Sequence, residues 1–373
     1  MAGTRVSFVP PPYPYDRLDG LKKLAERHDG GPVDCSIGTP NDAPPDFVIA
    51  QLAKGVGARG YPASIGSPEY REAAASWLER RFAVSVGTDQ LAACVGTKEF
   101  VASLAQYLHL RWPERDTVLY PGVSYPTYAM GAALAGLRAV PVTMKGGELD
   151  LASISPDDAQ RALVLWSNSP SNPTGGLDDL EAVATWGRIH DVLVASDECY
   201  ASFTWTGRPR SILEHGLEGV LAVHSVSKRS NLAGVRAGFY AGDPDVVAFL
   251  RLVRQHAGLM VPGPVQSAVA LAYGDDAHVQ VQRDRYRSRL ALLAGALADN
   301  GVDAPLPDGG FYLWCSMPGV DGWRLAEMLA DVSGMIVSPG ELYGDAGTPF
   351  VRIAVVQPDE RLALVASRLS SLA

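Results

Sequence analysis

The fold class of this chain is decided by one stretch, His224-Ser225-Val226-Ser227-Lys228-Arg229-Ser230-Asn231-Leu232-Ala233-Gly234-Val235-Arg236. Ser225 and Ser227 alternate along a predicted strand end, Lys228 follows them, and Arg236 comes after a turn that contains glycine. A lysine amine forms an imine with a carbonyl cofactor when its surroundings lower its pKa. Serine hydroxyls and a guanidinium suit the anchoring of a phosphate group. The stretch therefore predicts a site for a phosphate-bearing carbonyl cofactor.

Two predicted strands upstream end in polar residues. Asp197-Glu198-Cys199-Tyr200 follows the apolar run at 192–195, and a turn rich in proline and glycine at 167–176 follows another apolar run. Such runs are typical of buried parallel strands, and open α/β sheets bind ligands at the carboxyl ends of their strands. A buried aspartate such as Asp197 pairs well with a protonated pyridine nitrogen. Asn172, in the turn, could donate its amide to an oxygen of the same ring.

Two further segments match this arrangement. Gly96-Thr97-Lys98-Glu99 follows a strand-like run at 91–95 and precedes a helix that we expect from about Glu99. A turn of small residues at the start of a helix presents backbone N–H groups to a phosphate. Tyr125 follows a predicted strand at 117–120, where its ring could stack on a cofactor ring, and Tyr128 competes with it for that place.

In this order along the chain, the residues resemble those of fold-type I pyridoxal-phosphate enzymes of the class I/II aminotransferase family. Other strings of the family occur at 37–40, 60–66, 309–314, 339–344 and 351–353. The resemblance implies an α/β fold with a large domain, in which helices sandwich a mostly parallel seven-stranded sheet, and a small α/β domain. We expect residues 1–45 to join the small domain, 46–272 to form the large cofactor-binding domain, and 273–373 to form the small C-terminal domain.

The resemblance also implies a role for each site residue. Lys228 would carry the cofactor, pyridoxal 5'-phosphate, in an imine and act as the general base, while Asp197 would pair with the pyridine nitrogen. Asn172 and Tyr200 would bond the ring hydroxyl oxygen, and Tyr125 would stack on the ring. The catalytic residues would be Lys228, Asp197 and Tyr200. The phosphate would be held by Gly96, Thr97, Lys98, Ser225, Ser227 and Arg236, with Tyr61 from the neighbouring subunit. The substrate α-carboxylate would be bound by Gly38, Asn172 and Arg352.

A narrower resemblance is to the succinyldiaminopimelate aminotransferases of actinobacteria. It rests on the strings at 96–99, 167–175, 196–200, 224–234 and 256–262. It implies transfer of an amino group from N-succinyl-LL-2,6-diaminopimelate to 2-oxoglutarate, a step of lysine and diaminopimelate biosynthesis. Two roles stay open for Lys98, which could contact the cofactor phosphate through its backbone or reach the distal carboxylate of a substrate.

Two other functions would use the same fold. The first is different pyridoxal-phosphate chemistry in specialised metabolism, namely β- or γ-elimination or replacement, cyclisation or oxidation, because the cofactor supplies the reaction. The second is a non-catalytic regulator that senses ligands with an aminotransferase-like fold. Such regulators usually carry a DNA-binding module, and the chain has no spare length or basic segment for one.

The composition limits the partners of the protein. The chain has 373 residues, a net charge of −9 and 47% hydrophobic residues, which favours a globular enzyme and argues against nucleic-acid binding. No run of about 18 apolar residues occurs, so we expect no membrane span. The cysteines and histidines lack metal-ligand spacing, so we expect no metal. We expect a cytoplasmic homodimer with shared active sites that acts on small amino acids and 2-oxo acids.

Overall fold

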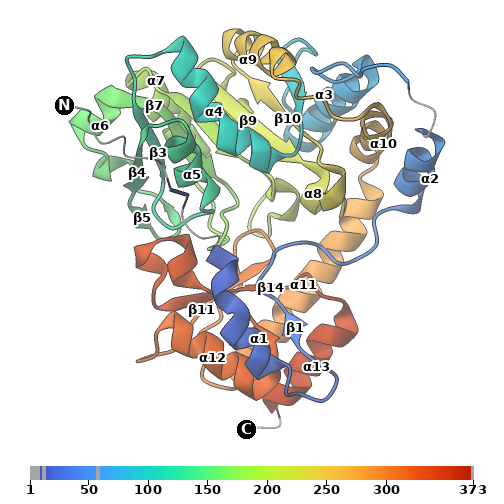
Figure 1. The fold of residues 1–373 in the computed structure, drawn as a ribbon, viewed down its shortest axis with the longest axis vertical. Helices are drawn as coiled ribbons and strands as arrows, with labels where there is room; N and C mark the ends of the chain where they lie inside the picture. The colour runs from blue at the N-terminus through green and yellow to red at the C-terminus, as the bar shows by residue number, and fades with distance from the viewer. Residues whose placement is uncertain (1–8, 11–13, 56–58, 371–373) are drawn as a thin grey trace.

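A seven-stranded sheet runs through the larger part of the structure, a computed structural model that describes residues 9–10, 14–55 and 59–370 (Figure 1). From edge to edge its strands are β2 (Leu91–Cys94), β10 (Gly238–Gly242), β9 (Val220–Ser225), β8 (Leu193–Asp197), β7 (Ala162–Asn168), β3 (Thr117–Pro121) and β4 (Arg138–Val142). In this sheet only β10 runs antiparallel to its neighbours. Every residue of β7, β8 and β9 is buried, as expected for apolar strands covered on both faces. The predicted mostly parallel, seven-stranded sheet is confirmed.

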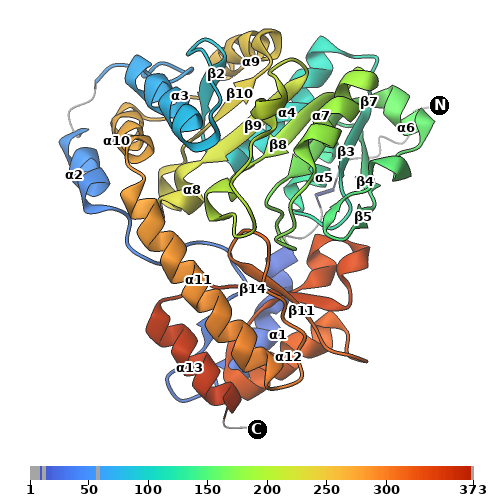
Figure 2. The same ribbon diagram turned by 180° about the vertical axis from the view of Figure 1, so that it is seen from behind.

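Helices cover both faces of this sheet, as the view from behind also shows (Figure 2). One face packs against α3 (Pro68–Phe82), α7 (Leu180–Ile189) and α10 (Gly263–Gly274). The other face packs against α4 (Thr97–Arg111), α5 (Thr127–Leu134) and α9 (Pro244–His256). The outer helix α2 (Asp46–Lys54) lies against α10, and α6 (Pro156–Arg161) precedes β7. The sheet is therefore sandwiched between two helical layers, as the resemblance implies.

Local signals explain where two of these helices begin. Ser67 accepts a hydrogen bond of 3.2 Å from the backbone N–H of Tyr70 and so caps α3, with Pro68 in its first turn. Helix α4 begins at Thr97 and not at the expected Glu99, because Gly96 adopts a φ of +76° and turns the chain directly from β2 into the helix. Glycine reaches this conformation without the steric cost that a Cβ atom would bring.

The stretch that decides the fold differs locally from its prediction. The alternating serines predicted a continuing strand, whereas β9 ends at Ser225, and Ser227 and Lys228 lie in the one-turn helix α8 (Val226–Arg229). The hydroxyl of Ser225 accepts a hydrogen bond of 3.0 Å from the N–H of Ser227. This cap starts the helix at the strand end, so α8 projects Lys228 beyond the edge of the sheet.

A second hydrophobic core lies below the large sheet in Figure 1 and joins the two ends of the chain. Its buried residues come mainly from the ranges 18–35 and 286–369. Its elements are η1 (Pro14–Leu18), α1 (Asp19–Ala25), β1 (Val33–Asp34), α11 (Ala277–Ala298), β11 (Tyr312–Ser316), α12 (Gly322–Ser333), β12 (Met335–Ile336), β13 (Ser338–Pro339), β14 (Phe350–Ala354) and α13 (Asp359–Ser370). The long helix α11 leads into this part from α10 (Figure 2). The expected domain boundaries at 45 and 272 stay a prediction.

The remaining elements are short. Strands β5 (Met144–Lys145) and β6 (Glu148–Leu149) pair as a hairpin, β11, β14 and β13 form an antiparallel sheet, and β1 pairs with β12 in parallel. Short 3-10 turns lie at Leu151–Ser153, Ala201–Phe203, Ile212–His215, Ala233–Val235, Gly340–Tyr343 and Asp345–Gly347. Among the helices in the described ranges, none combines the length and the apolar character that crossing a membrane requires.

Candidate active site

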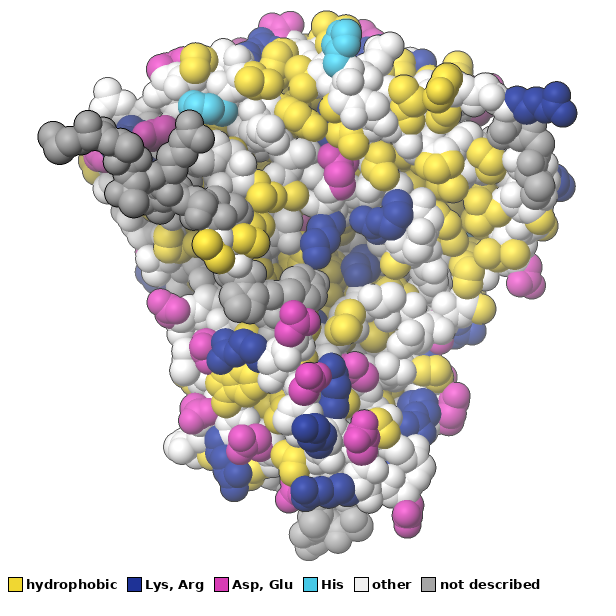
Figure 3. All heavy atoms as spheres, viewed as in Figure 1, with side chains coloured by type: hydrophobic (Ala, Val, Ile, Leu, Met, Phe, Trp, Pro, Cys, Tyr) yellow, Lys and Arg dark blue, Asp and Glu magenta, His cyan; other side chains and the backbone are white. Residues whose placement is uncertain are grey.

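A cavity of about 390 Å³ lies where the carboxyl ends of β7, β8 and β9 meet the N-terminal segment and β14. Several Lys and Arg side chains gather in the hollow between the upper and lower parts of the molecule (Figure 3). The sequence-predicted residues that line the cavity are Gly38, Thr97, Lys98, Tyr125, Asn172, Asp197, Tyr200, Ser225, Ser227, Lys228, Arg236 and Arg352. The topology therefore brings together residues that lie far apart in the sequence.

Two of the predicted residues do not line this cavity. Gly96 is not among the lining residues, but a Cβ atom added to it would lie 2.3 Å from Nη2 of Arg236, which does line the cavity. The glycine therefore leaves the space that the Arg236 guanidinium occupies beside the start of α4. Tyr61 is 97% exposed and lies on the surface of the chain. Its predicted role concerns a second subunit, so its exposure leaves that role a prediction.

Lys228 reaches into the cavity from α8. Its Nζ donates a hydrogen bond to the backbone oxygen of Gly38, so the lysine contacts the N-terminal segment. Burial lowers the pKa of Lys228 to about 8, and the nearby cations Arg352 and Arg236 act in the same direction. A half-buried amine with this pKa is neutral in an appreciable fraction of molecules near neutral pH. It has the properties that a nucleophilic or proton-accepting lysine needs.

Asp197 ends β8 and is buried under the cavity. Its Oδ2 accepts a hydrogen bond of 2.9 Å from the hydroxyl of Tyr128, and its Oδ1 accepts one of 3.2 Å from the backbone N–H of Cys199. Burial raises the pKa of the Asp197 carboxyl, while these hydrogen bonds favour its charged form. A buried, oriented carboxylate with this balance is suited to pairing with a protonated ring nitrogen.

The residues expected at the phosphate surround the start of α4 and α8. The hydroxyl of Ser225 donates to that of Ser227 over 2.8 Å, and Sγ of Cys199 lies 3.3 Å from Oγ1 of Thr97. Arg236 has a φ of +54°, which is uncommon for a residue with a side chain, and its Nη1 donates to the oxygen of Ala233 over 2.9 Å. Hydroxyls, helix N–H groups and a guanidinium are the donors that a phosphate requires.

Arg352 lies on β14 and is 1% exposed. Its Nη1 donates to Oδ1 of Asn172 over 2.8 Å, and its Nη2 donates to the backbone oxygen of Ser36. The guanidinium carbon lies 4.3 Å from the ring centroid of Tyr312 and 4.8 Å from that of Tyr343. Its Nε has no hydrogen-bond partner among the described residues. A buried cation in this state favours an anionic ligand.

Several residues of the cavity were not predicted from the sequence. They are Tyr15, Ile37, Thr39, Val101, Tyr128 in its observed position, Asn168, Cys199, Ala233 and Tyr312. Tyr312 bonds the hydroxyl of Tyr200 over 2.7 Å, and a Cβ atom added to Gly38 would lie 2.1 Å from the Tyr312 hydroxyl. Tyr312 belongs to the family string at 309–314, and the alternation along β11 could have indicated that it faces inward.

Comparison with known proteins identifies the family of this chain. The model of the family described as aminotransferase class I and II matches residues 32–369. The chain belongs to the class I and II aminotransferases. Members of this family depend on pyridoxal 5'-phosphate and act on amino acids and oxo acids. The predicted α/β fold of type I, the enzyme class and the cofactor are thereby confirmed.

This aminotransferase resembles proteins with different printed activities. It is 42% identical to 4-dedimethylamino-4-oxo-anhydrotetracycline transaminase OxyQ of Streptomyces rimosus, over 96% of this chain and 99% of OxyQ. It is also 42% identical to a probable aminotransferase of Mycobacterium tuberculosis, over 98% of this chain and 86% of that protein. Its identity to LL-diaminopimelate aminotransferase of Desulforudis audaxviator is 34%, over 96% and 95% of the two chains. A solved aminotransferase from Neisseria meningitidis superposes with a TM-score of 0.90 at 28% identity, covering 97% and 98% of the two chains.

The residues of the cavity fit pyridoxal phosphate. The space left by Gly96 holds a guanidinium beside two serine hydroxyls and the first N–H groups of α4, a set of donors for the phosphate. The buried Asp197 and the half-buried Lys228, with its lowered pKa, line the same cavity. The role of each residue nevertheless stays a prediction, and the substrate is not decided by the family.

Proposed function

We propose that this aminotransferase transfers the amino group of an acidic amino acid to 2-oxoglutarate, with N-succinyl-LL-2,6-diaminopimelate as its donor. The observation that carries the proposal is Arg352, a buried cation that lines the cavity and whose Nε has no hydrogen-bond partner among the described residues. A second cation, Lys98, lines the same cavity and lies 5.8 Å from the ring centroid of Tyr125. Two separated cations suit a donor that carries an α-carboxylate and a distal carboxylate. The similarity to an LL-diaminopimelate aminotransferase supports a donor of this class.

In the proposed reaction, Arg352 and Asn172 bind the α-carboxylate. The hydrogen bond between them fixes the guanidinium, and the rings of Tyr312 and Tyr343 hold its plane. A guanidinium held in this way can donate two parallel hydrogen bonds to a carboxylate. The substrate is thus oriented before the reaction, which lowers the entropic part of the barrier.

Lys228 and Asp197 handle the protons. Bound pyridoxal phosphate supplies an electron sink that stabilises negative charge at the substrate Cα. The neutral amine of Lys228 would accept the Cα proton and pass it to carbon C4′ of the cofactor, as transfer of the amino group requires. Asp197, oriented by Tyr128 and the N–H of Cys199, keeps a proton at the ring nitrogen. The hydroxyls of Tyr200 and Tyr312 lie 2.7 Å apart and both residues line the cavity. They are placed to form hydrogen bonds with a ligand there.

The donor is tested by measuring glutamate formation from 2-oxoglutarate with a panel of amino acids. We expect the largest kcat/KM for N-succinyl-LL-2,6-diaminopimelate. LL-diaminopimelate, an aromatic amino acid and a branched amino acid are the matched alternatives. An aromatic or branched donor with a higher kcat/KM would refute the proposed substrate, and release of an oxo acid without glutamate would instead indicate elimination chemistry.

A second candidate acceptor is a ketone on a polycyclic ring. OxyQ, named for a 4-oxo-anhydrotetracycline, is 42% identical to this chain over nearly its whole length, more than the LL-diaminopimelate aminotransferase is. Ile37 lines the cavity and is 48% exposed, so an apolar surface is available at the cavity. Amination of a polycyclic ketone with glutamate as donor, followed by mass spectrometry, tests this candidate in the same preparation.

We further propose a cytoplasmic homodimer in which Tyr61 completes the partner's site. The support is its position outside its own cavity with 97% of its surface exposed. Hybrids of Tyr61→Ala and Lys228→Ala chains would then carry one site with both changes and one with neither. Random mixing makes about half of the dimers hybrids, and one of the two equivalent sites in each hybrid would be intact. The mixture should therefore regain up to about a quarter of wild-type activity. Mixed chains no more active than the separate variants would contradict shared sites.

A further inference from the structure

A second cavity, of about 200 Å³, lies beside α8 and shares no lining residue with the active site. Arg229, which directly follows Lys228, forms one wall. Arg81 at the end of α3 and Arg283 on α11 form others. The volume is below the roughly 300 Å³ from which pockets for drug-sized molecules start, so any ligand here is small.

Arg229 is the buried centre of this cluster. Its side chain is 2% exposed, and its guanidinium carbon lies 5.3 Å from the ring centroid of Trp77. Nη1 donates to the backbone oxygen of Ala272 over 2.7 Å, and Nη2 lies 3.4 Å from Oδ1 of Asp276. Its Nε, however, is buried without a hydrogen-bond partner. An unpartnered donor on a buried cation is costly unless a ligand or water accepts its hydrogen bond.

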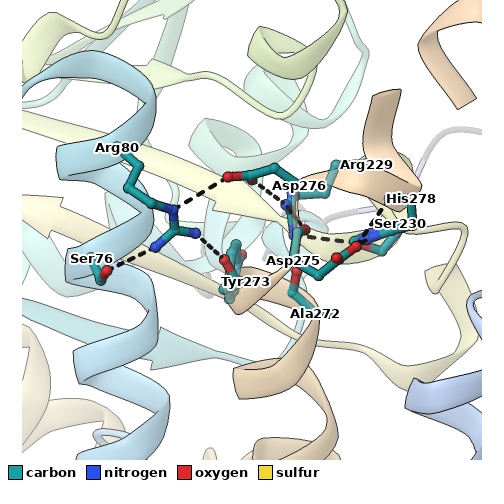
Figure 4. A network of polar contacts seen from close by, with 9 residues as sticks. All are labelled: Ser76, Arg80, Arg229, Ser230, Ala272, Tyr273, Asp275, Asp276 and His278. Atoms are coloured by element: carbon teal, nitrogen blue, oxygen red, sulfur yellow. Dashed lines mark hydrogen bonds and ion pairs between the residues drawn. The ribbon is translucent and has the colours of Figure 1, made fainter. Parts of the chain in front are cut away.

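Among the described residues, Asp276 is the carboxylate that forms ion pairs at this cluster. Figure 4 shows Arg80 and Arg229 both directed at Asp276, whose side chain is 51% exposed. Arg283 donates to the backbone oxygens of Ser202 and Thr204 and has no carboxylate partner. Arg81 makes no hydrogen bond or ion pair with any residue that the structure describes, although it is half-buried. Positive charge in the cavity therefore exceeds negative charge.

The pKa values of two of these arginines also favour a bound anion. Burial lowers the pKa of Arg229 to about 10 and that of Arg283 to about 10, and Arg81 acts on both in the same direction. Guanidinium groups stay charged at physiological pH even so. The lowered values therefore arise mainly because burial removes water from these cations, and an anion bound among them would stabilise their charge.

We propose that this cavity binds a small oxyanion of the phosphate type. Three guanidinium groups from three separate elements surround it, and Nε of Arg229 supplies a donor that no protein group uses. Guanidinium groups bind phosphate oxygens with paired, charge-assisted hydrogen bonds. The bound anion would link α3, α8 and α11. It would do so next to Lys228, the predicted cofactor lysine, which directly precedes Arg229.

The test titrates inorganic phosphate into the holoenzyme by calorimetry. Arg81→Gln removes one cation without removing a structural hydrogen bond, and glutamine is a good helix former. Arg287→Gln is the matched control, because Arg287 is an exposed arginine one turn along α11 from Arg283 and outside the cavity. We expect Arg81→Gln to weaken phosphate binding at least about tenfold. The control should change it less than about threefold.

Thermal unfolding gives a second readout on the same proteins. Phosphate should raise the Tm of the wild type and of Arg287→Gln, because a ligand that binds only the folded state stabilises it, and should raise that of Arg81→Gln much less. The proposal is overturned if the wild-type holoenzyme shows no saturable binding at millimolar phosphate. It is equally overturned if Arg81→Gln binds phosphate as tightly as the wild type, which would place the anion elsewhere.

Discussion

The hydroxyl of Tyr128 donates a hydrogen bond of 2.9 Å to Oδ2 of Asp197. The ring of Tyr128 lies 5.1 Å from that of Trp166, so it is packed beneath the cavity and held against the carboxylate. This contact assigns Tyr128 to the orientation of Asp197, and it leaves Tyr125 as the candidate for stacking on the cofactor. The acid that is expected to control the cofactor ring is thus positioned by a residue of α5, a helix that packs against β3 and β4.

Asp197→Asn should retain pyridoxal phosphate but lose activity by roughly a hundredfold or more, because a neutral amide cannot keep the ring nitrogen protonated. Tyr128→Phe is the control, since it keeps the carboxylate and removes one hydrogen bond, worth about 0.5–1.5 kcal/mol. Nitrogen NMR of labelled cofactor measures the protonation directly. A protonated nitrogen together with a near wild-type rate in Asp197→Asn would refute the role.

Lys228→Ala should abolish covalent attachment of the cofactor. Lys228 and Lys98 both line the cavity, so the matched variant Lys98→Ala should keep the attachment. Borohydride reduction followed by mass spectrometry of the protein reports the linkage without any need for turnover. A cofactor mass on the reduced Lys228→Ala protein would show that another amine forms the bond.

Attachment of the cofactor to the apoenzyme should speed up as the pH rises, with its midpoint near 8. Burial lowers the pKa of Lys228 from 10.5 to about 8, and only the neutral amine attacks a carbonyl. Between these values the unfolded chain binds more protons than the folded one, so this group also makes stability rise with pH in that window. Stopped-flow absorbance gives the rate, and a midpoint close to 10.5 would mean that Lys228 is solvated in the apoenzyme.

Gly96→Ala should weaken cofactor binding, because its Cβ would lie 2.3 Å from Nη2 of Arg236 and displace the guanidinium. Gly136→Ala is a matched control, with a similar φ of +72° but no atom within 4 Å of the new Cβ. Both changes place a Cβ atom on a backbone with positive φ and should cost about 1–3 kcal/mol of folding free energy. Fluorescence titration should find a weaker cofactor Kd only for Gly96→Ala, and equal values for the two variants would contradict the contact.

Arg352→Lys should lower kcat/KM roughly tenfold to a hundredfold, the cost of about 1.5–3 kcal/mol for a lost charged hydrogen bond. Lysine keeps the charge but not the paired geometry, and it cannot keep both bonds to Asn172 and Ser36. Steady-state kinetics should show the loss for donor and acceptor alike, since both carry an α-carboxylate, with cofactor affinity unchanged. A loss for only one of them would place Arg352 at the distal group.

The sequence by itself determined the sheet, the order of the motifs along it and most of the cavity residues. Strand ends, the cap at Ser67 and the turn that contains Asn172 are local signals, because they depend on the conformation of a few neighbouring residues. The start of α4 was placed two residues late, since the positive φ of Gly96, which turns the chain directly into the helix, is not evident from the residue types alone. The serine alternation was misread for a similar reason, because a strand and a short capped helix share that pattern over a few residues.

Only the tertiary structure decided what surrounds Arg352. The hydroxyls of Tyr15 and Tyr343 lie 3.0 Å apart although 328 positions separate them in the chain, and the ring of Tyr312 covers the guanidinium from a third segment. The arginine cavity beside α8 likewise joins α3, α8 and α11. Hydrophobic periodicity states which face of an element is buried, but not which distant side chain meets it there. Which distant side chains meet is decided when the two cores pack together. These contacts set the charge and the hydrogen bonding of both cavities.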